Sequence, residues 1–344
     1  MTCGTIIMVI DLDIYITRIK ELAKNFSYND FIGLLKELDN EIMNKNIKEI
    51  SPEFLYYFNQ IMGLVNDQYI VDNKPGTLGH MLVENALVSK QKISPTLMMY
   101  FYLEQKGNLG LNNTYNNIKF TDNKEVGTMG VSIGTPFTLK LNLDYLKKAG
   151  EIDDYNYEIM EGLLHEITHV HQYSIPENTE KLFDKLTYYD IECYLAIFKY
   201  LNDTEKNIIY SSVLSEFMAN EQSRAYMLNI AENHPEYFNE KLIEQKRIQY
   251  VQERKISPRQ QFSDSLGFLR FLYKDKMHEI QPFFNSIGQI LAESSKIEEQ
   301  LKAQGISEDI NYSYYNIFSN SLYQFDGERI IINNDLQTKS TKGI

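Results

Sequence analysis

The spacing of apolar residues changes twice along this chain of 344 residues, and that change restricts its fold class. Over the first hundred residues apolar side chains recur every three or four positions, for example through residues 31–42, which is the period of an amphipathic helix. From about Gly110 the period becomes two, as in a β-strand. After Asp144 the helical period returns and continues almost to the C-terminus. The sequence therefore predicts a predominantly helical α+β protein with one small, mostly antiparallel sheet.

Three segments of the middle region have the alternating pattern of strands. They are residues 116–121, 126–133 and 137–143. The third is the clearest, because its apolar residues alternate strictly with polar ones, as in a strand with one buried face. Residues 122–124, Asp-Asn-Lys, are typical of a turn between the first two strands.

The same patterns divide the chain into three regions. We expect a helical N-terminal region at residues 1–107, a central region with the sheet at 108–232, and a helical C-terminal region at 233–344. In the central region a helical pattern runs without interruption through 204–231. Asp326-Gly327, between short apolar runs, suits a tight hairpin turn near the C-terminus.

Charge and composition exclude several classes of partner. The chain has 34 Lys and Arg residues against 47 Asp and Glu residues, a formal net charge of -13 that disfavours binding to nucleic acids and to anionic membrane surfaces. No apolar run is long enough to predict a membrane span. Two cysteines cannot build a disulfide framework, and the N-terminus lacks the basic region of a signal peptide. We expect a cytoplasmic protein, or one exported without a classical signal peptide.

The segment 162–172, Gly-Leu-Leu-His-Glu-Ile-Thr-His-Val-His-Gln, contains a His-Glu-x-x-His motif within a helical pattern. At about 100° per residue, His165 and His169 are about 40° apart around the helix axis, so both imidazoles can reach one ion. Glu166 is about 60° from His169, close enough to contact a metal-bound water without binding the metal. A common stripe roughly opposite the histidines is apolar: Ile159, Leu163, Ile167 and Val170. The pattern predicts a helix with one core face and one metal-binding face.

A catalytic zinc ion needs a third protein ligand and one position open to water. The helical segment 215–227 offers Glu216 and Glu221, and His171 is a further candidate. His171 lies about 160° around the helix from His169, which makes it a poor ligand. Glu216 is followed by apolar and small residues that allow close helix packing beneath a site, whereas Glu221 stands in a polar run. We therefore favour Glu216, with Glu221 as the alternative.

Together these segments resemble a known group of enzymes. The glycine-containing strand pattern, His165-Glu166-x-x-His169 and the later Glu216-Phe-Met-Ala are similar to the gluzincins, the zincin metallopeptidases whose third zinc ligand is a glutamate. The Glu216 segment resembles the third-ligand helix of anthrax lethal factor and the Pro-Pro endopeptidases. The resemblance covers about residues 110–230 and implies a zincin-like core in which the sheet lies over the motif helix.

The resemblance also implies a role for individual residues. His165, His169 and Glu216 would bind Zn2+, and Glu166 would act as the general base. Tyr210, six residues before Glu216, would stabilise the oxyanion. The chain departs from the family at Asn220, where many gluzincins have an acidic residue that supports a ligating histidine.

We therefore expect a zinc-dependent endopeptidase with a restricted protein substrate, either a toxin or effector or a regulatory protease. An extended peptide substrate would pair with strand 137–143 or with the glycine-containing strand 126–133. The alternative is a helical protein-binding module with a structural or vestigial metal site, an interpretation that Asn220 supports. The sequence leaves the oligomeric state open.

Overall fold

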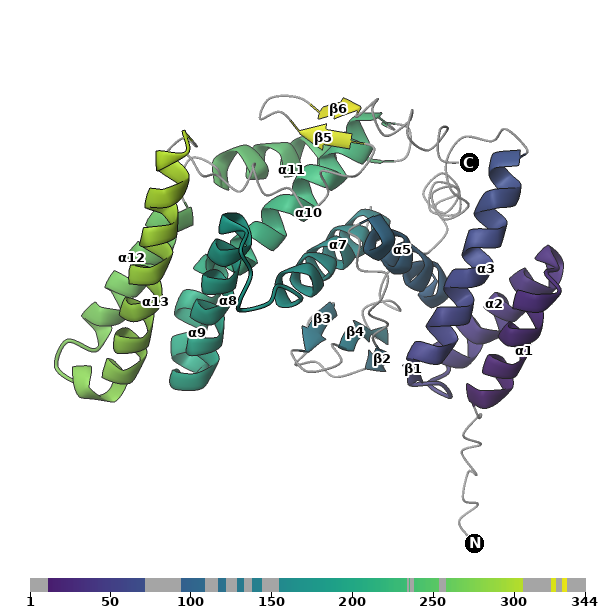
Figure 1. Cartoon of the computed structure of the whole chain (residues 1–344), viewed down its shortest axis with the longest axis horizontal. Coiled ribbons are helices and arrows are strands. Elements are labelled where there is room, and N and C mark those ends of the chain that lie inside the picture. Colours follow the sequence, from purple (N-terminus) through teal and green to yellow (C-terminus); the bar gives the residue numbers. More distant parts are fainter. Residues whose placement is uncertain are drawn as a thin grey trace, which may run out of the picture. The chain divides into compact units, whose positions relative to one another are not determined.

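The computed structural model describes residues 12–71, 94–108, 117–121, 129–132, 138–143, 155–233, 235, 238–253, 258–305, 323–325 and 330–332. Helices dominate these residues and a small sheet accompanies them, which confirms the predominantly helical α+β class (Figure 1). The chain forms two compact units, Met1–Ile167 with His234–Asn239, and Thr168–Asn233 with Glu240–Ile344. Their boundary falls inside one helix of the expected central region, and the expected division into three regions stays a prediction.

The described N-terminal residues of the first unit form α1 (Leu12–Lys24), α2 (Tyr28–Met43), α3 (Pro52–Val71) and α5 (Pro95–Asn108). The apolar stripe predicted at residues 31–42 is buried, because α2 packs against α1 and α5 along that face. Ser51 caps α3 as its sequence indicates, since its Oγ accepts a hydrogen bond from the backbone N–H of Phe54 (3.3 Å). The local signals and the packing therefore agree in this region.

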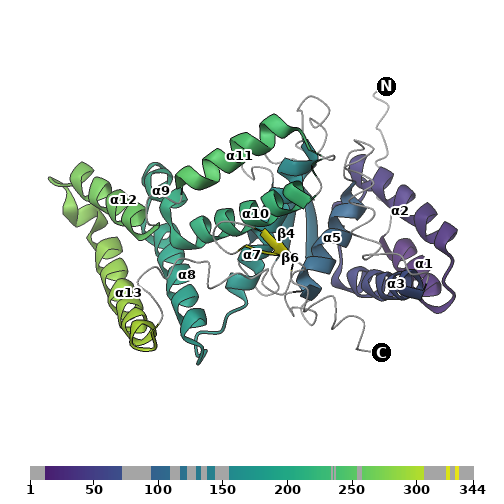
Figure 2. The ribbon, with the colours of Figure 1, turned by 90° about the horizontal axis from the view of Figure 1, so that it is seen from above.

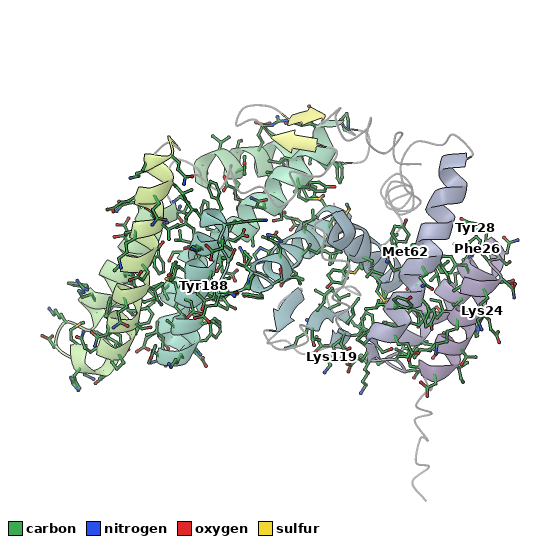
Figure 3. The ribbon with its side chains drawn as sticks, viewed as in Figure 1. Lys24, Phe26, Tyr28, Met62, Lys119 and Tyr188 are labelled. Atoms are coloured by element: carbon green, nitrogen blue, oxygen red, sulfur yellow. The ribbon has the colours of Figure 1, made fainter. Side chains whose placement is uncertain are left out.

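The sheet of this unit has four strands: β1 (Glu49–Ile50), β2 (Asn117–Thr121), β3 (Met129–Ser132) and β4 (Thr138–Asn142). Their order is β1-β2-β4-β3, with antiparallel pairs at both edges and a parallel pair, β2 with β4, in the centre. All three predicted strands are present, and β1 adds a short fourth strand that the sequence patterns did not indicate. Lys119 of β2, labelled in Figure 3, forms an ion pair with Glu49 of β1 (3.5 Å).

The sequence neighbours β2 and β3 do not pair with each other, because β4 lies between them. The predicted turn at residues 122–124 lies outside the described residues. Ile118 of β2 and Leu139 of β4 are aligned in the parallel register and are both buried. Apolar side chains of the central pair thus determine which strands become neighbours.

The second unit consists mainly of helices: α8 (Leu182–Tyr200), α9 (Asp203–Ile209), the 3-10 turn η2 (Tyr210–Ser212), α10 (Leu214–Asn233), α11 (Glu240–Glu253), α12 (Pro258–Leu272) and α13 (Met277–Ala303). Helix α7 (Tyr155–Tyr173) contains the unit boundary and contributes its last six residues to this unit. α13 packs along α8, and α10 runs beside α11, as both views show (Figures 1 and 2). One apolar cluster joins α8, α9, α12 and α13.

The single helix expected over residues 204–231 is wrong, because the chain breaks between α9 and α10. Val213 adopts an extended conformation (φ -62°, ψ 135°), and the Ser212 hydroxyl donates a hydrogen bond to the Ile209 carbonyl (2.8 Å). Serine side chains compete for backbone groups, and a β-branched residue disfavours helix, which explains the break. As a result Tyr210 and Glu216 stand on different elements, with Glu216 in the first turn of α10.

The predicted C-terminal hairpin is confirmed by β5 (Tyr323–Phe325) and β6 (Ile330–Ile332), which pair in antiparallel fashion. Phe325 pairs with Ile330, and the turn predicted at Asp326-Gly327 lies outside the described residues. Within the described part of the chain, no helix combines the length and apolar character that crossing a membrane requires.

Candidate metal centre

Helix α7 presents two chemically different faces. The apolar stripe predicted from the sequence is buried, with exposed fractions of 2% or less: Ile159, Leu163, Ile167 and Val170. His169 and Glu166 are also buried, at 4% and 9% exposure, whereas His165 is half-buried. The motif residues are therefore held by a helix whose orientation is set by its core face.

Three side chains converge as a possible metal-binding group: His165, His169 and Glu216. One ligand atom from each lies within 4.8 Å of the other two. The Nε2 atom of His169 and the Oε1 atom of Glu216 are 3.2 Å apart. Two ligands on one tetrahedral zinc ion, each about 2.0–2.1 Å from the metal, are about 3.3 Å apart, so the observed separation fits a shared ion.

Gln172, one turn after His169 on α7, links His169 to Ser215, the residue before Glu216. Its Oε1 lies 2.8 Å from Nδ1 of His169, and its Nε2 donates a hydrogen bond to the backbone carbonyl of Ser215 (3.1 Å). Since a carbonyl can only accept, the amide nitrogen must face Ser215 and the amide oxygen must face His169. His169 then carries a proton on Nδ1, and in the neutral imidazole the lone pair of Nε2 faces Glu216.

This arrangement has an electrostatic consequence for the donor group. In the neutral imidazole the Nε2 lone pair of His169 and the carboxylate of Glu216 face each other at 3.2 Å. Two electron-rich atoms at that distance repel each other, and a cation between them removes the repulsion. The donor set and its outer hydrogen bonds thus fit a metal ion that prefers nitrogen and oxygen ligands.

Tyr210 reaches the same group from η2. Burial and the nearby Glu216 carboxylate, with which Tyr210 also forms a hydrogen bond, raise the pKa of Tyr210 above its ordinary value. The phenol therefore keeps its proton and can donate a hydrogen bond. The break before α10 allows this contact. In one continuous helix, residues 210 and 216 would be about 120° apart around the axis and would point in different directions.

The ring of Tyr173 stacks on the imidazole of His169. The two rings stack nearly in parallel, with centroids 5.6 Å apart and an angle of 10° between their planes. Burial raises the pKa of Tyr173, and the charge of Glu216 and a hydrogen bond with Tyr194 contribute to the same effect. The sequence analysis did not single out Gln172 or Tyr173. They follow His169 by three and four residues, respectively, and this spacing places both near the same face of the helix as His169.

No protein-family model, curated protein or solved structure matches this chain. The resemblance to the gluzincins therefore stays a prediction that rests on the motif residues.

The remaining predicted residues lie elsewhere on α10 and α7. Glu221 and Asn220 line a cavity of about 320 Å³, together with Ser211, Phe217, Arg224, Tyr250 and Gln261. Glu221 is not in the converging donor group, and neither is His171, a half-buried residue whose pKa is lowered by burial. The acceptor beside His169 is Gln172, not Asn220.

Proposed function

We propose that this chain is a zinc-dependent endopeptidase with a restricted protein substrate. The observation that carries the proposal is the convergence of His165, His169 and Glu216 within 4.8 Å, with Glu166 on the same helix as both histidines. Two imidazoles and one carboxylate are the ligand set of a catalytic zinc site, in which a fourth position stays open. Bound zinc would polarise the scissile carbonyl and lower the pKa of a coordinated water.

The chain's own residues would carry the proton transfers. Glu166, buried beside the donor group, would accept a proton from the attacking water and pass it to the leaving nitrogen. The hydroxyl of Tyr210 would donate a hydrogen bond to the developing oxyanion, a role that its protonated phenol suits. Gln172 would hold the imidazole of His169 in the tautomer that directs Nε2 to the metal.

The sheet supports one of the two strands considered for substrate binding. β4 has β2 on one side and β3 on the other, so both of its edges are occupied. Among the described strands, β3 pairs only with β4, which leaves its second edge available to an extended peptide. Backbone pairing at that edge would bind peptides without regard to their side chains.

Two variants test the proposal. Glu166→Gln should retain one zinc per chain and lose hydrolysis of a diverse peptide library by about 10²–10⁴-fold, because only the general base is removed. His169→Ala should lose both zinc and activity. Elemental analysis and chelator-sensitive cleavage measure the two effects. Full zinc content in His169→Ala would refute the ligand assignment, and unchanged hydrolysis in Glu166→Gln would refute the mechanism.

A helical protein-binding module with a structural metal site is the second candidate, and an observation on α12 favours it. Phe268, Phe271 and Leu272 are about half exposed or more (52%, 64% and 49%) and fall within about 100° of one another around the helix. Exposed apolar residues gathered on one helix face can mark a contact surface. Metal retention without any chelator-sensitive cleavage, and no effect of Glu166→Gln, would favour this candidate.

A further inference from the structure

A series of aromatic rings leads from the donor group to exposed side chains. The ring of Tyr173, which stacks on His169, is 6.2 Å from that of Tyr194. Tyr194 in turn contacts Phe198 (4.8 Å) and Tyr210 (5.9 Å), and the last two rings are 6.1 Å apart. All of these separations fall in the range of favourable aromatic pairs. We call Tyr173, Tyr194, Phe198 and Tyr210 the aromatic wall.

Three elements of one compact unit build this wall. Tyr194 and Phe198 are four residues apart on α8, so they lie on one face of that helix. Tyr173 comes from the last turn of α7, and Tyr210 begins η2. The break between α9 and α10 thus places Tyr210 against α8 while it also hydrogen-bonds to Glu216.

Two rings of the wall are more exposed than the other two. Tyr173 and Tyr194 are half-buried, whereas Tyr210 is 38% and Phe198 46% exposed. A phenyl ring with that exposure has much of its apolar area in water, where it contributes little to folding. Phe198 and Tyr210 meet edge to face, with an angle of 81° between their planes. The Nζ atom of Lys206 lies 5.3 Å from the centroid of Phe198, and the remaining exposed area of the two rings, which meet at a corner, can contact a further aromatic ring.

We propose that the aromatic wall is a substrate subsite that binds an aromatic side chain of the peptide. This inference rests on the proposed peptidase function and names the class of substrate. Tyr210 contacts both Glu216 and the exposed ring of Phe198, so a side chain held in the corner brings its own backbone next to the donor group. An aromatic side chain would gain contact area against these rings.

Binding tests the subsite without depending on turnover. Two pools of random octapeptides, identical except for phenylalanine or glycine at one central position, are titrated by fluorescence polarisation onto the zinc-loaded Glu166→Gln chain. The phenylalanine pool should bind about tenfold more tightly, as expected for burial and stacking of one ring. Phe198→Ala in the same background should reduce that preference to about twofold or less.

Tyr28→Ala is the matched control, because Tyr28 is 48% exposed, close to the value for Phe198, and lies on α2 outside the wall. It should keep the preference of the parent chain, and circular dichroism should show that both variants remain folded. Equal binding of the two pools, or a preference that survives Phe198→Ala, would overturn the subsite.

Cleavage of the same pools by the wild-type chain separates the two proposals. If peptides are cleaved and Phe198→Ala retains the full phenylalanine preference, the subsite fails and the peptidase function stands. If the Phe198-dependent binding preference is present and no peptide is cleaved, the peptidase function fails and the wall stands as a binding site for aromatic side chains.

Discussion

Two interfaces of the second unit bury opposite kinds of side chain. The cluster that joins α8, α9, α12 and α13 is almost wholly apolar and includes Cys193, Ile197, Phe262, Leu269 and Phe283. Where α7 meets the first turn of α10, the buried residues that join the two helices are polar or charged: His169, Gln172, Ser215 and Glu216. Both interfaces join helices, yet only the second holds a converging donor group.

The contrast shows what each interface contributes. Apolar burial stabilises the fold in proportion to the area removed from water. Buried polar groups cost free energy unless each has a partner, so a helix interface that keeps several of them is an expensive way to gain stability. The bonds of Gln172 to His169 and Ser215 provide such partners and fix the orientation of the His169 imidazole. We infer that the apolar cluster supports the fold and the α7–α10 interface supports the metal centre.

The largest effect on zinc affinity is expected from substitution of Glu216, and Glu221 on the same helix provides the comparison. Glu216→Gln should weaken zinc binding by more than the roughly 10–100-fold typical of an outer hydrogen-bond partner, since it removes a charged ligand. Glu221→Gln, on the cavity side, should leave zinc affinity unchanged. Competition with a colorimetric chelator measures both. The reverse order of effects would transfer the ligand role to Glu221.

A substitution in the apolar cluster should lower the stability of the fold and leave zinc affinity unchanged. Phe283 is fully buried, and Phe283→Ala should lower the free energy of unfolding by about 3–5 kcal/mol through lost burial and the cavity left behind. The fraction that stays folded should bind zinc as the parent does. Urea denaturation of the metal-free chain and zinc titration separate the two quantities. A change in zinc affinity without a loss of stability would contradict the division of roles.

The smallest effect on zinc affinity is expected from substitution of Gln172, which lies between α7 and α10. Gln172→Met preserves length and removes both hydrogen bonds, so zinc affinity should fall about 10–100-fold. Gln172→Glu keeps an acceptor for His169 and loses the donor to Ser215, so it should recover part of that loss. Isothermal titration gives both affinities. If Gln172→Met binds zinc like the parent chain, Gln172 does not orient His169.

The sequence predicted what depends on neighbouring residues. The helical period placed His165 and His169 on one face of α7 and the apolar stripe on another, because helix geometry repeats every few residues. The same reasoning gave the three strands of the middle region. It failed at residues 210–213, where the apolar period continues through a break made by serine and valine.

Only the tertiary structure showed which distant segments contact one another. The sequence alone left Glu216 and Glu221 as alternatives, and packing of α10 against α7 brings Glu216 to His169. Gln172 meets Ser215 across 43 positions of the chain, and β4 inserts between β2 and β3. Local sequence encodes conformation and periodicity, whereas these pairings depend on which surfaces bury the most area together. The motif was therefore readable from the sequence, which also favoured Glu216, whereas the convergence of Glu216 with the histidines, the Gln172 amide and the aromatic wall came from the packing of the helices.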